Sequence, residues 1–188
     1  MNQQNSNYLL LPVRGICSVL ILLAAMTGTI FWYEDQERKL FLWLSRPHKT
    51  IVPLLYSLSP AVLSGICGII AIILTGFARQ LLQECICMGL FLLAITAYSM
   101  LLRELFSDRN IYLASILYSV VGSILFCPVF ADLTTVLPIA KPLRILSPVS
   151  YYLNSIYSLR ARWELLYYSV LAFVTAIGIH LFHRSLSR

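Results

Sequence analysis

Residues 15–33 read Gly-Ile-Cys-Ser-Val-Leu-Ile-Leu-Leu-Ala-Ala-Met-Thr-Gly-Thr-Ile-Phe-Trp-Tyr, an unbroken stretch between Arg14 and Glu34 without one charged side chain. A charged side chain at the centre of a bilayer costs about 2.5–3.5 kcal/mol, and a helix needs about 20 apolar residues to cross one. This stretch therefore predicts a membrane-spanning helix.

Four more uncharged stretches of similar or greater length follow along the chain. They lie between Lys49 and Arg79, between Glu84 and Arg103, between Arg109 and Asp132, and between Glu164 and Arg184. We predict an all-α polytopic membrane protein with a single transmembrane domain, residues 1–188. Its five spans are expected near 15–33, 51–75, 84–104, 111–131 and 163–183.

Composition supports the same class. Of 188 residues, 59% are hydrophobic and 12% charged, with a mean hydropathy of +0.80. In an average soluble domain, roughly half of the residues are hydrophobic and roughly a quarter are charged. Such a chain has too little polar surface to cover itself in water, so a lipid bilayer must surround most of it.

The net charge of +6 is scattered between the apolar stretches. A nucleic-acid site needs basic residues clustered on one face, so we expect no nucleic-acid partner and interpret the basic residues as topology signals. The first seven residues lack the positive charge of a signal peptide, so we expect the first apolar stretch to be retained.

Residues that could carry chemistry are few. The five cysteines lie in or beside apolar stretches, and Cys85 and Cys87 would point about 200° apart on a helix, which is unfavourable for a shared metal. His180 and His183 fit the end of the last span better than a metal site. Glu84 and Glu164 fall at span ends, where we expect hydrated carboxylates.

Nucleotide-binding and proteolytic motifs are also missing. No Gly-x-x-x-x-Gly-Lys-Ser/Thr occurs, and no paired acidic and histidine residues lie within the spans. We expect neither an enzyme nor a catalytic, cofactor or metal site, and any ATP hydrolysis has to come from another chain.

The second span carries Pro53 and Pro60. Pro53 fits the first turn of a helix, whereas Pro60 is expected to bend it. Small residues at 64, 65 and 68 permit close helix packing, within one subunit or between two, as do Gly15 and Gly122.

Basic residues near the span ends predict the orientation. One side of the membrane carries eight Lys and Arg, in segments 34–50, 104–110 and 184–188 with Arg103 at their edge. The other side carries six, in segments 1–14, 76–83 and 132–162. The loops of the first side are short, and its basic residues lie close to the spans, where the positive-inside rule applies. We expect this side, with the C-terminus, to face the cytoplasm, and the N-terminus to lie outside.

The segment 34–46 begins with acidic residues and ends at Ser-Arg-Pro, which favours a short helix. Its apolar face carries Phe41 and Trp43. It fits equally a helix in the headgroup layer, with Trp43 as an interface anchor, and a coupling helix that binds a cytoplasmic protein.

The segment 127–154 holds four of the eight prolines. It is too apolar for a solvated loop and too interrupted for a spanning helix. Short helices that re-enter the outer leaflet over 132–154 reconcile both properties. The alternative is a span broken by proline, followed by a plain loop.

Two stretches carry a resemblance to a known family. Cys-Pro-Val-Phe-Ala-Asp-Leu (127–133) and Leu-Ser-Pro-Val-Ser-Tyr-Tyr-Leu-Asn (146–154) resemble the run after the fifth helix of ABC-2-type transporter permeases. In that family this run forms re-entrant helices before the last span. Tyr-Glu-Asp-Gln-Glu-Arg-Lys (33–39) is in the place of the family's cytoplasmic helix that contacts the ATPase subunit. The order of elements over about residues 8–184 agrees with the family.

The resemblance implies a permease subunit in the plasma membrane, acting in export and powered by a separate ATP-binding subunit, with a second permease chain as partner. A non-transporting scaffold or accessory subunit is the alternative. The family usually has one more helix ahead of the first span, so we expect a truncated chain, a partner that supplies that helix, or a degenerate paralogue.

The resemblance also implies two sets of site residues. The residues expected to couple to the ATPase are Glu34, Asp35, Glu37, Arg38, Phe41 and Trp43. The residues expected at an outer re-entrant gate are Cys127, Pro128, Phe130, Asp132, Pro148, Tyr151 and Tyr152.

Overall fold

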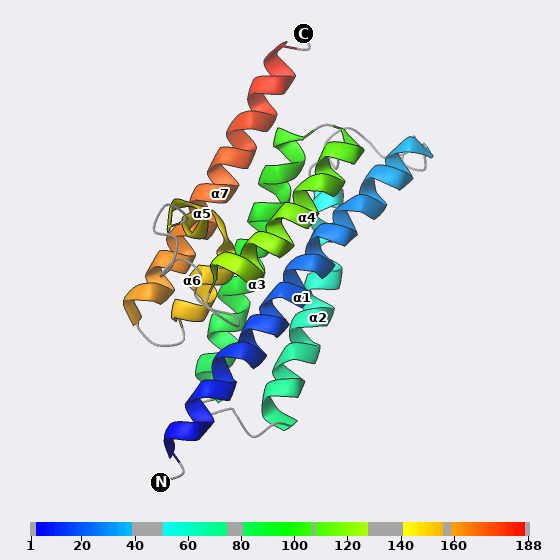
Figure 1. Ribbon diagram of the computed structural model, residues 1–188. Coiled ribbons are helices and arrows are strands. Elements are labelled where there is room, and N and C mark those ends of the chain that lie inside the picture. The colour runs from blue at the N-terminus through cyan, green and yellow to red at the C-terminus, as the bar shows by residue number, and fades with distance from the viewer. Residues whose placement is uncertain are drawn as a thin grey trace.

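The computed structural model describes residues 3–38, 51–74, 81–106, 108–127, 141–155 and 159–186. Seven helices account for nearly all of these residues, and the described part of the chain contains no strand (Figure 1). The helices are α1 Gln3–Glu37, α2 Ile51–Leu74, α3 Leu81–Leu105, α4 Arg109–Phe126, α5 Lys141–Leu146, α6 Pro148–Ser155 and α7 Leu159–Leu186.

Five of the helices are long and apolar enough to cross a membrane. Their candidate spans are Pro12–Glu37, Val52–Leu74, Leu81–Leu105, Arg109–Phe126 and Arg160–Phe182. The prediction of an all-α polytopic membrane protein with five spans is thus confirmed. α2 continues as one helix through Pro60, and the bend expected there stays a prediction.

Two predicted boundaries are wrong. The sequence predicts a separate helix from residue 34 onward, yet Glu34–Glu37 form the last turn of α1. No proline or glycine separates them from the apolar stretch, and glutamate is a good helix former, so the helix continues. The fourth span ends at Phe126 instead of 131, because Cys127 has an extended backbone and precedes Pro128, and a residue before proline is disfavoured in the helical region.

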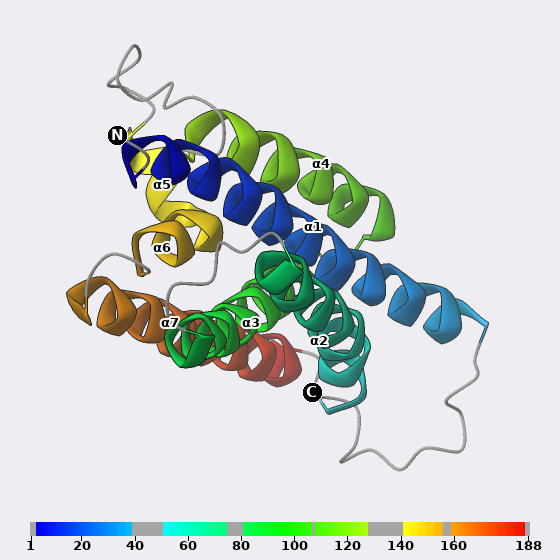
Figure 2. The same ribbon diagram turned by 90° about the horizontal axis from the view of Figure 1, so that it is seen from below.

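The helices pack in two groups. α1 packs most extensively on α2 and also contacts α4, whereas α3 packs most extensively on α7. Figure 2 shows α1 lying between α4 and α2. α2 also contacts α3, and this contact joins the two groups.

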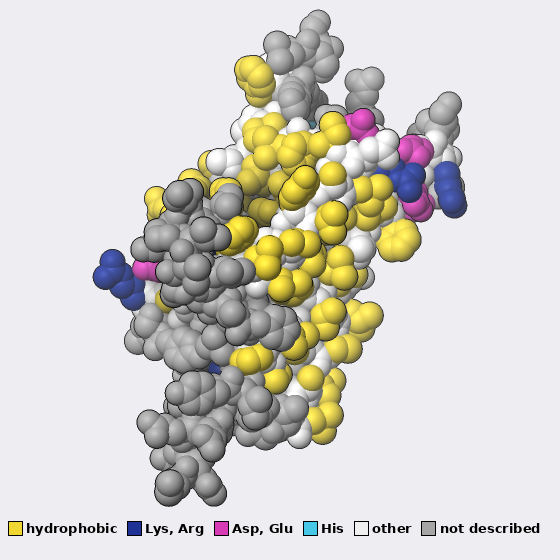
Figure 3. All heavy atoms as spheres, in the orientation of Figure 1, with side chains coloured by type: hydrophobic (Ala, Val, Ile, Leu, Met, Phe, Trp, Pro, Cys, Tyr) yellow, Lys and Arg dark blue, Asp and Glu magenta, His cyan; other side chains and the backbone are white. Residues whose placement is uncertain are grey.

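Lipid-facing side chains occur on every candidate span. Leu20, Leu63, Leu82, Leu117 and Leu181, one from each of these helices, are all more than half exposed. In Figure 3, hydrophobic side chains cover the visible face of α1 and α4, and charged side chains gather where α1 ends and α4 begins. This distribution is that of a protein whose sides contact hydrocarbon.

A hydroxyl network links three helices between these apolar faces. Thr29 Oγ1 lies 2.7 Å from Ser99 Oγ, which lies 3.1 Å from Tyr112 Oη. All three residues are buried. Because α1, α3 and α4 each contribute one hydroxyl, the network fixes their relative register at the centre of the bundle.

The short helices α5 and α6 lie alongside the spans. Tyr152 stacks on Phe91 of α3 with ring centroids 4.3 Å apart, and Tyr151 contacts the ring of Tyr168 of α7 at 5.0 Å. Phe91 is ten residues from the start of α3, or about 15 Å at 1.5 Å per residue. Since α3 has 25 residues, α6 packs beside the middle of this candidate span.

Among the glycines that the structure describes, Gly28 makes the tightest contact between two helices. A Cβ there would collide with the carbonyl oxygen of Tyr56 and lie 2.7 Å from Pro60 Cγ. Gly65 is less tight, with Leu92 of α3 at 3.2 Å, and Gly68 makes ordinary contacts. Small residues do allow close packing, but the sequence interpretation missed Gly28 as the position that requires it most.

We therefore expect Gly28→Leu to separate α1 from α2 and to lower the free energy of unfolding by about 1–3 kcal/mol. Unfolding of the purified protein in detergent, followed by circular dichroism, measures this change. Gly178→Leu is the matched control, because nothing lies within 4 Å of its added Cβ. Equal stability of the two variants would contradict the close α1–α2 contact.

Candidate functional site

The acidic end of α1 is tied to the start of α4. Arg109 Nη2 lies 2.7 Å from Glu34 Oε1, and Arg109 Nη1 lies 3.5 Å from Glu37 Oε2. The Glu37 side chain is 61% exposed and that of Glu34 31%. One arginine thus holds two carboxylates that both remain accessible from outside the bundle.

The same turn of α1 is also tied to α2. Tyr56 Oη donates a hydrogen bond to Asp35 Oδ2 at 2.5 Å. Through Asp35 and the Arg109 pairs, the acidic end of α1 connects to both neighbouring helices. Side-chain contacts therefore hold both α2 and α4 to this turn of α1.

Four of the predicted coupling residues belong to this end. Glu34, Asp35 and Glu37 form the last turn of α1, and Arg38 follows it, with its backbone N–H donating to Glu34 O at 3.0 Å. Phe41 and Trp43 lie outside the described residues. The sequence interpretation missed Arg109 and Tyr56, although the opposite charges of Arg109 and the acidic turn offered a signal.

A second polar group lies at the same end of the bundle. Tyr33 Oη donates to the carbonyl of Phe106 at 2.8 Å, which ties α1 to the end of α3. Glu104 pairs with Arg103, and Glu104 Oε2 lies 3.2 Å from His180 Nδ1, within hydrogen-bonding distance. His180, interpreted from sequence as a helix-end residue, therefore connects α7 to α3.

The predicted gate residues that the structure describes lie near the other end of α3 and α7. Pro148, Tyr151 and Tyr152 share the helix α6, and Tyr152 is fully buried. Cys127 is buried at the end of α4, where its N–H donates to Ser123 O at 3.2 Å. Pro128, Phe130 and Asp132 lie outside the described residues.

The carbonyl groups at the ends of α5 and α6 are capped by other helices. Tyr168 Oη of α7 donates to Leu146 O at 2.8 Å. Arg162 Nε and Cys87 Sγ both donate to Ser155 O, at 3.2 and 3.7 Å. These bonds replace the water that would solvate a helix end at the surface of a soluble protein.

A buried ion pair lies beside α6. Arg14 of α1 pairs with Glu84 of α3, and the two side chains are only 6% and 7% exposed. The expectation of a hydrated Glu84 is wrong, because α6 and the start of α1 cover the end of α3. Glu164, in contrast, is half exposed and pairs with Arg160 at 3.4 Å.

Three buried polar atoms of this cluster have no hydrogen-bond partner among the described residues, namely Arg14 Nε, Glu84 Oε2 and Tyr152 Oη. Burial, and next the negative charge of Glu84, raises the pKa of the Tyr152 phenol, so it stays protonated. The cluster joins α1, α3 and α6 by charge and hydroxyl groups. It provides no nucleophile with an adjacent base.

Among the residues that the structure describes, no group of three or more His, Cys, Asp or Glu could hold a metal ion. Comparisons with models of known families, with curated proteins and with solved structures find no match. The function is therefore argued from the geometry and the sequence pattern of this chain.

Removing one partner of a buried ion pair leaves an uncompensated charge, which typically costs about 3–5 kcal/mol. We expect Arg14→Met and Glu84→Leu each to destabilise the protein by about that much. The double variant Arg14→Met/Glu84→Leu should regain most of the loss, because no charge remains buried. Detergent unfolding of the four proteins gives the coupling free energy, and simple addition of the two losses would contradict a direct pair.

Proposed function

We propose that the chain is the membrane-spanning permease subunit of an ABC-2-type exporter, powered by a separate ATP-binding subunit and paired with a second permease chain. It lies in the plasma membrane with its N-terminus outside and its C-terminus in the cytoplasm. The acidic end of α1 receives the ATP-binding subunit, and α5 and α6 close the outer side.

One observation carries this proposal: the two ends of the bundle are built differently. One end presents an exposed ion-paired group between two helices, Arg109 of α4 with Glu34 and Glu37 of α1. The exposed pair at the other end, Arg160 with Glu164, lies within α7 alone. The other end is covered by the short helices α5 and α6, which pack beside the candidate spans α3 and α7. A device that receives force on one side and opens a path on the other needs this asymmetry.

The packing supports a mechanism of relative movement. α1, α2 and α4 are linked at the acidic end by Arg109 and Tyr56, while α3 packs mainly on α7 and also contacts α6. Force on the end of α1 reaches α2 and α4 through these contacts, and it reaches α3 through the Thr29–Ser99–Tyr112 hydroxyl network. ATP-driven closure of the partner then changes the relative populations of inward-open and outward-open arrangements.

A charge-swap experiment tests the role of the acidic end. The tagged chain is purified in mild detergent from cells that also express its candidate ATP-binding subunit, and vanadate-sensitive ATP hydrolysis of the eluate is measured. We expect Glu34→Lys/Glu37→Lys to reduce the co-purified activity by about tenfold or more, equivalent to about 1.4 kcal/mol of binding free energy. Gln36→Lys, also exposed in the same turn, is the matched control and should retain it.

The triple variant Glu34→Lys/Glu37→Lys/Arg109→Glu separates coupling from folding. It restores an ion pair of reversed polarity between α1 and α4 while keeping the surface charge reversed. The proposal predicts a stable protein that still fails to retain the ATPase. Full recovery would show that the carboxylates only hold α4, and a wild-type chain that retains no ATPase would favour the non-transporting scaffold.

A further inference from the structure

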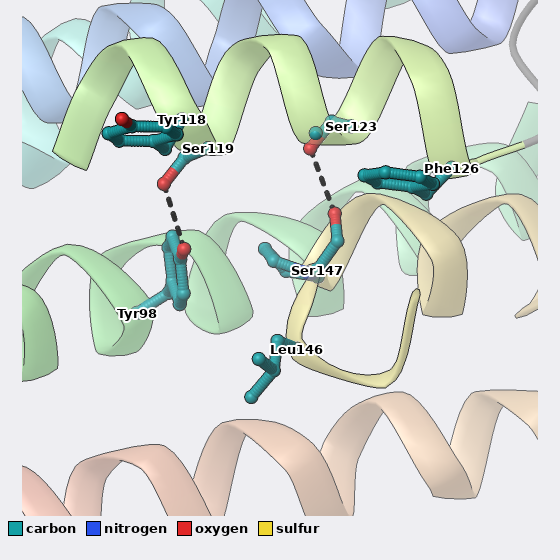
Figure 4. Close-up of a pocket in the computed structure, with 9 residues that line it drawn as sticks. Tyr98, Tyr118, Ser119, Ser123, Phe126, Leu146 and Ser147 are labelled. Carbon is teal, nitrogen blue, oxygen red and sulfur yellow. Dashed lines mark hydrogen bonds between the residues drawn. The ribbon is translucent and has the colours of Figure 1, made fainter. Parts of the chain in front are cut away.

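A cavity of about 260 Å³ lies between α4, α3 and the turn that joins α5 to α6 (Figure 4). Nine described residues line it: Tyr98, Tyr118, Ser119, Gly122, Ser123, Phe126, Leu146, Ser147 and Pro148. Neither polar end of the bundle contributes to this lining. The ATPase-coupling role proposed above does not use this cavity, although Leu146 and Pro148 of its lining belong to the helices α5 and α6 that are assigned to the outer side.

The cavity lies alongside the last turns of α4, which ends before α3 does. Tyr98 Oη and Ser119 Oγ lie 2.8 Å apart, so these two residues mark one level of the bundle. On one side of that level, α3 extends 17 residues to its first residue, Leu81, whereas α4 extends only seven residues to its last, Phe126. At about 1.5 Å per residue, α4 ends roughly 15 Å before α3 does. The turn at Ser147 lies beside Ser123, three residues before the end of α4.

Two hydroxyl pairs line the cavity. Besides Tyr98 and Ser119, Ser123 Oγ lies 2.9 Å from Ser147 Oγ (Figure 4). When two hydroxyls share one hydrogen bond, one proton is donated and the other proton remains available. The two pairs therefore leave two O–H donors that can serve a ligand.

The serine hydroxyls of α4 have different hydrogen-bond partners. Ser115 Oγ donates to the carbonyl of Tyr112 in its own helix at 2.7 Å, a local bond typical of serine within a helix. Ser119 and Ser123, one and two turns further, instead bond across the cavity to other elements. The polar groups at the cavity are thus directed away from their own helix.

The lining also restricts the ligand. None of the nine described lining residues is charged, so the site offers nothing to offset the desolvation of an ion. The rings of Tyr98, Tyr118 and Phe126 offer apolar faces. Tyr118 is 77% exposed and Leu146 64%, so the cavity opens at the side of the bundle that contacts lipid.

We propose that this cavity binds an uncharged amphiphile taken from the bilayer, whose ester, ether or carbonyl oxygens accept hydrogen bonds from the serine and tyrosine hydroxyls. The aromatic rings hold the apolar part adjoining these oxygens. The volume lies slightly below the smallest typical small-molecule sites, which enclose about 300 Å³. The cavity therefore takes the oxygen-bearing part and leaves the acyl chain in lipid. The site operates on this chain alone and goes beyond the proposed coupling to an ATPase.

Photolabelling in phosphatidylcholine vesicles tests the proposal, with the full chain and no ATP-binding subunit. The probe is a monoacylglycerol with a diazirine next to the ester, and the comparison probe is an alkyl diazirine without oxygen. We expect the monoacylglycerol to label the peptides around residues 118–126 and 146–148, and unlabelled monopalmitoylglycerol to compete better than palmitate.

Gly122→Leu fills the cavity. A Cβ at Gly122 has only Phe126 within 4 Å, at 3.9 Å, so the added Cβ makes an ordinary contact. The matched control is Gly178→Leu, whose Cβ meets nothing within 4 Å. Gly122→Leu should abolish the specific labelling, and Gly178→Leu should label like the wild type.

Ser119→Ala/Ser123→Ala tests the hydroxyls separately from the volume. We expect labelling by the monoacylglycerol to fall by about fivefold for each hydrogen bond lost, while labelling by the alkyl probe stays unchanged. Ser115→Ala is the control and should change neither. Equal labelling of wild type and Gly122→Leu, or equal effects of the serine variant on both probes, would overturn the proposal.

Discussion

In hydrocarbon, no water is available for backbone N–H and C=O groups, so each must find its partner within the protein. The long helices satisfy this requirement along their own length. α5 and α6 cannot, because in helices of six and eight residues most backbone groups are terminal and have no partner within the helix. Tyr168 caps the end of α5, and Arg162 and Cys87 cap the end of α6. These contacts allow irregular backbone to exist alongside the spans, and the rest of the architecture depends on them.

Several features follow from the packing of the short helices α5 and α6 beside the spans. α4 ends early, next to the break at Cys127, and the α5–α6 turn and the hydroxyl-lined cavity lie beside its last turns. α6 covers the start of α3, which buries Glu84 against Arg14. The opposite end of the bundle carries no such cover among the described residues, and there the carboxylates of Glu34 and Glu37 stay accessible. The asymmetry between the two ends is the basis of the proposed permease function.

The spans could be predicted from sequence because charge placement and hydrocarbon thickness act locally along the chain. The distance between Glu84 and Arg103, for example, fixes one span almost completely. Short helices around Pro148 could also be predicted, since proline interrupts an otherwise apolar segment. The end of α4 could have been predicted from Pro128, which disfavours a helical Cys127.

Pairings between distant positions could not be predicted in the same way. Arg14 and Glu84 are 70 residues apart, and Arg109 and Glu34 are 75 apart. Their contacts depend on which helices become neighbours, as does the tight approach at Gly28. A single sequence gives the charge or size of these residues but not their partners, so the acidic residues could be singled out while Arg109 was missed.

The depth of the short helices is the central claim, and spin labelling measures it directly. A nitroxide at Leu146, on the exposed side of α5, is compared in vesicles with nitroxides at Val170 of α7 and at Gln36 at the end of α1. Collisions with oxygen report hydrocarbon, and collisions with a water-soluble nickel chelate report water. The account predicts that Leu146 resembles Val170, with frequent oxygen and rare nickel collisions. Nickel collisions at Leu146 as frequent as those at Gln36 would contradict it.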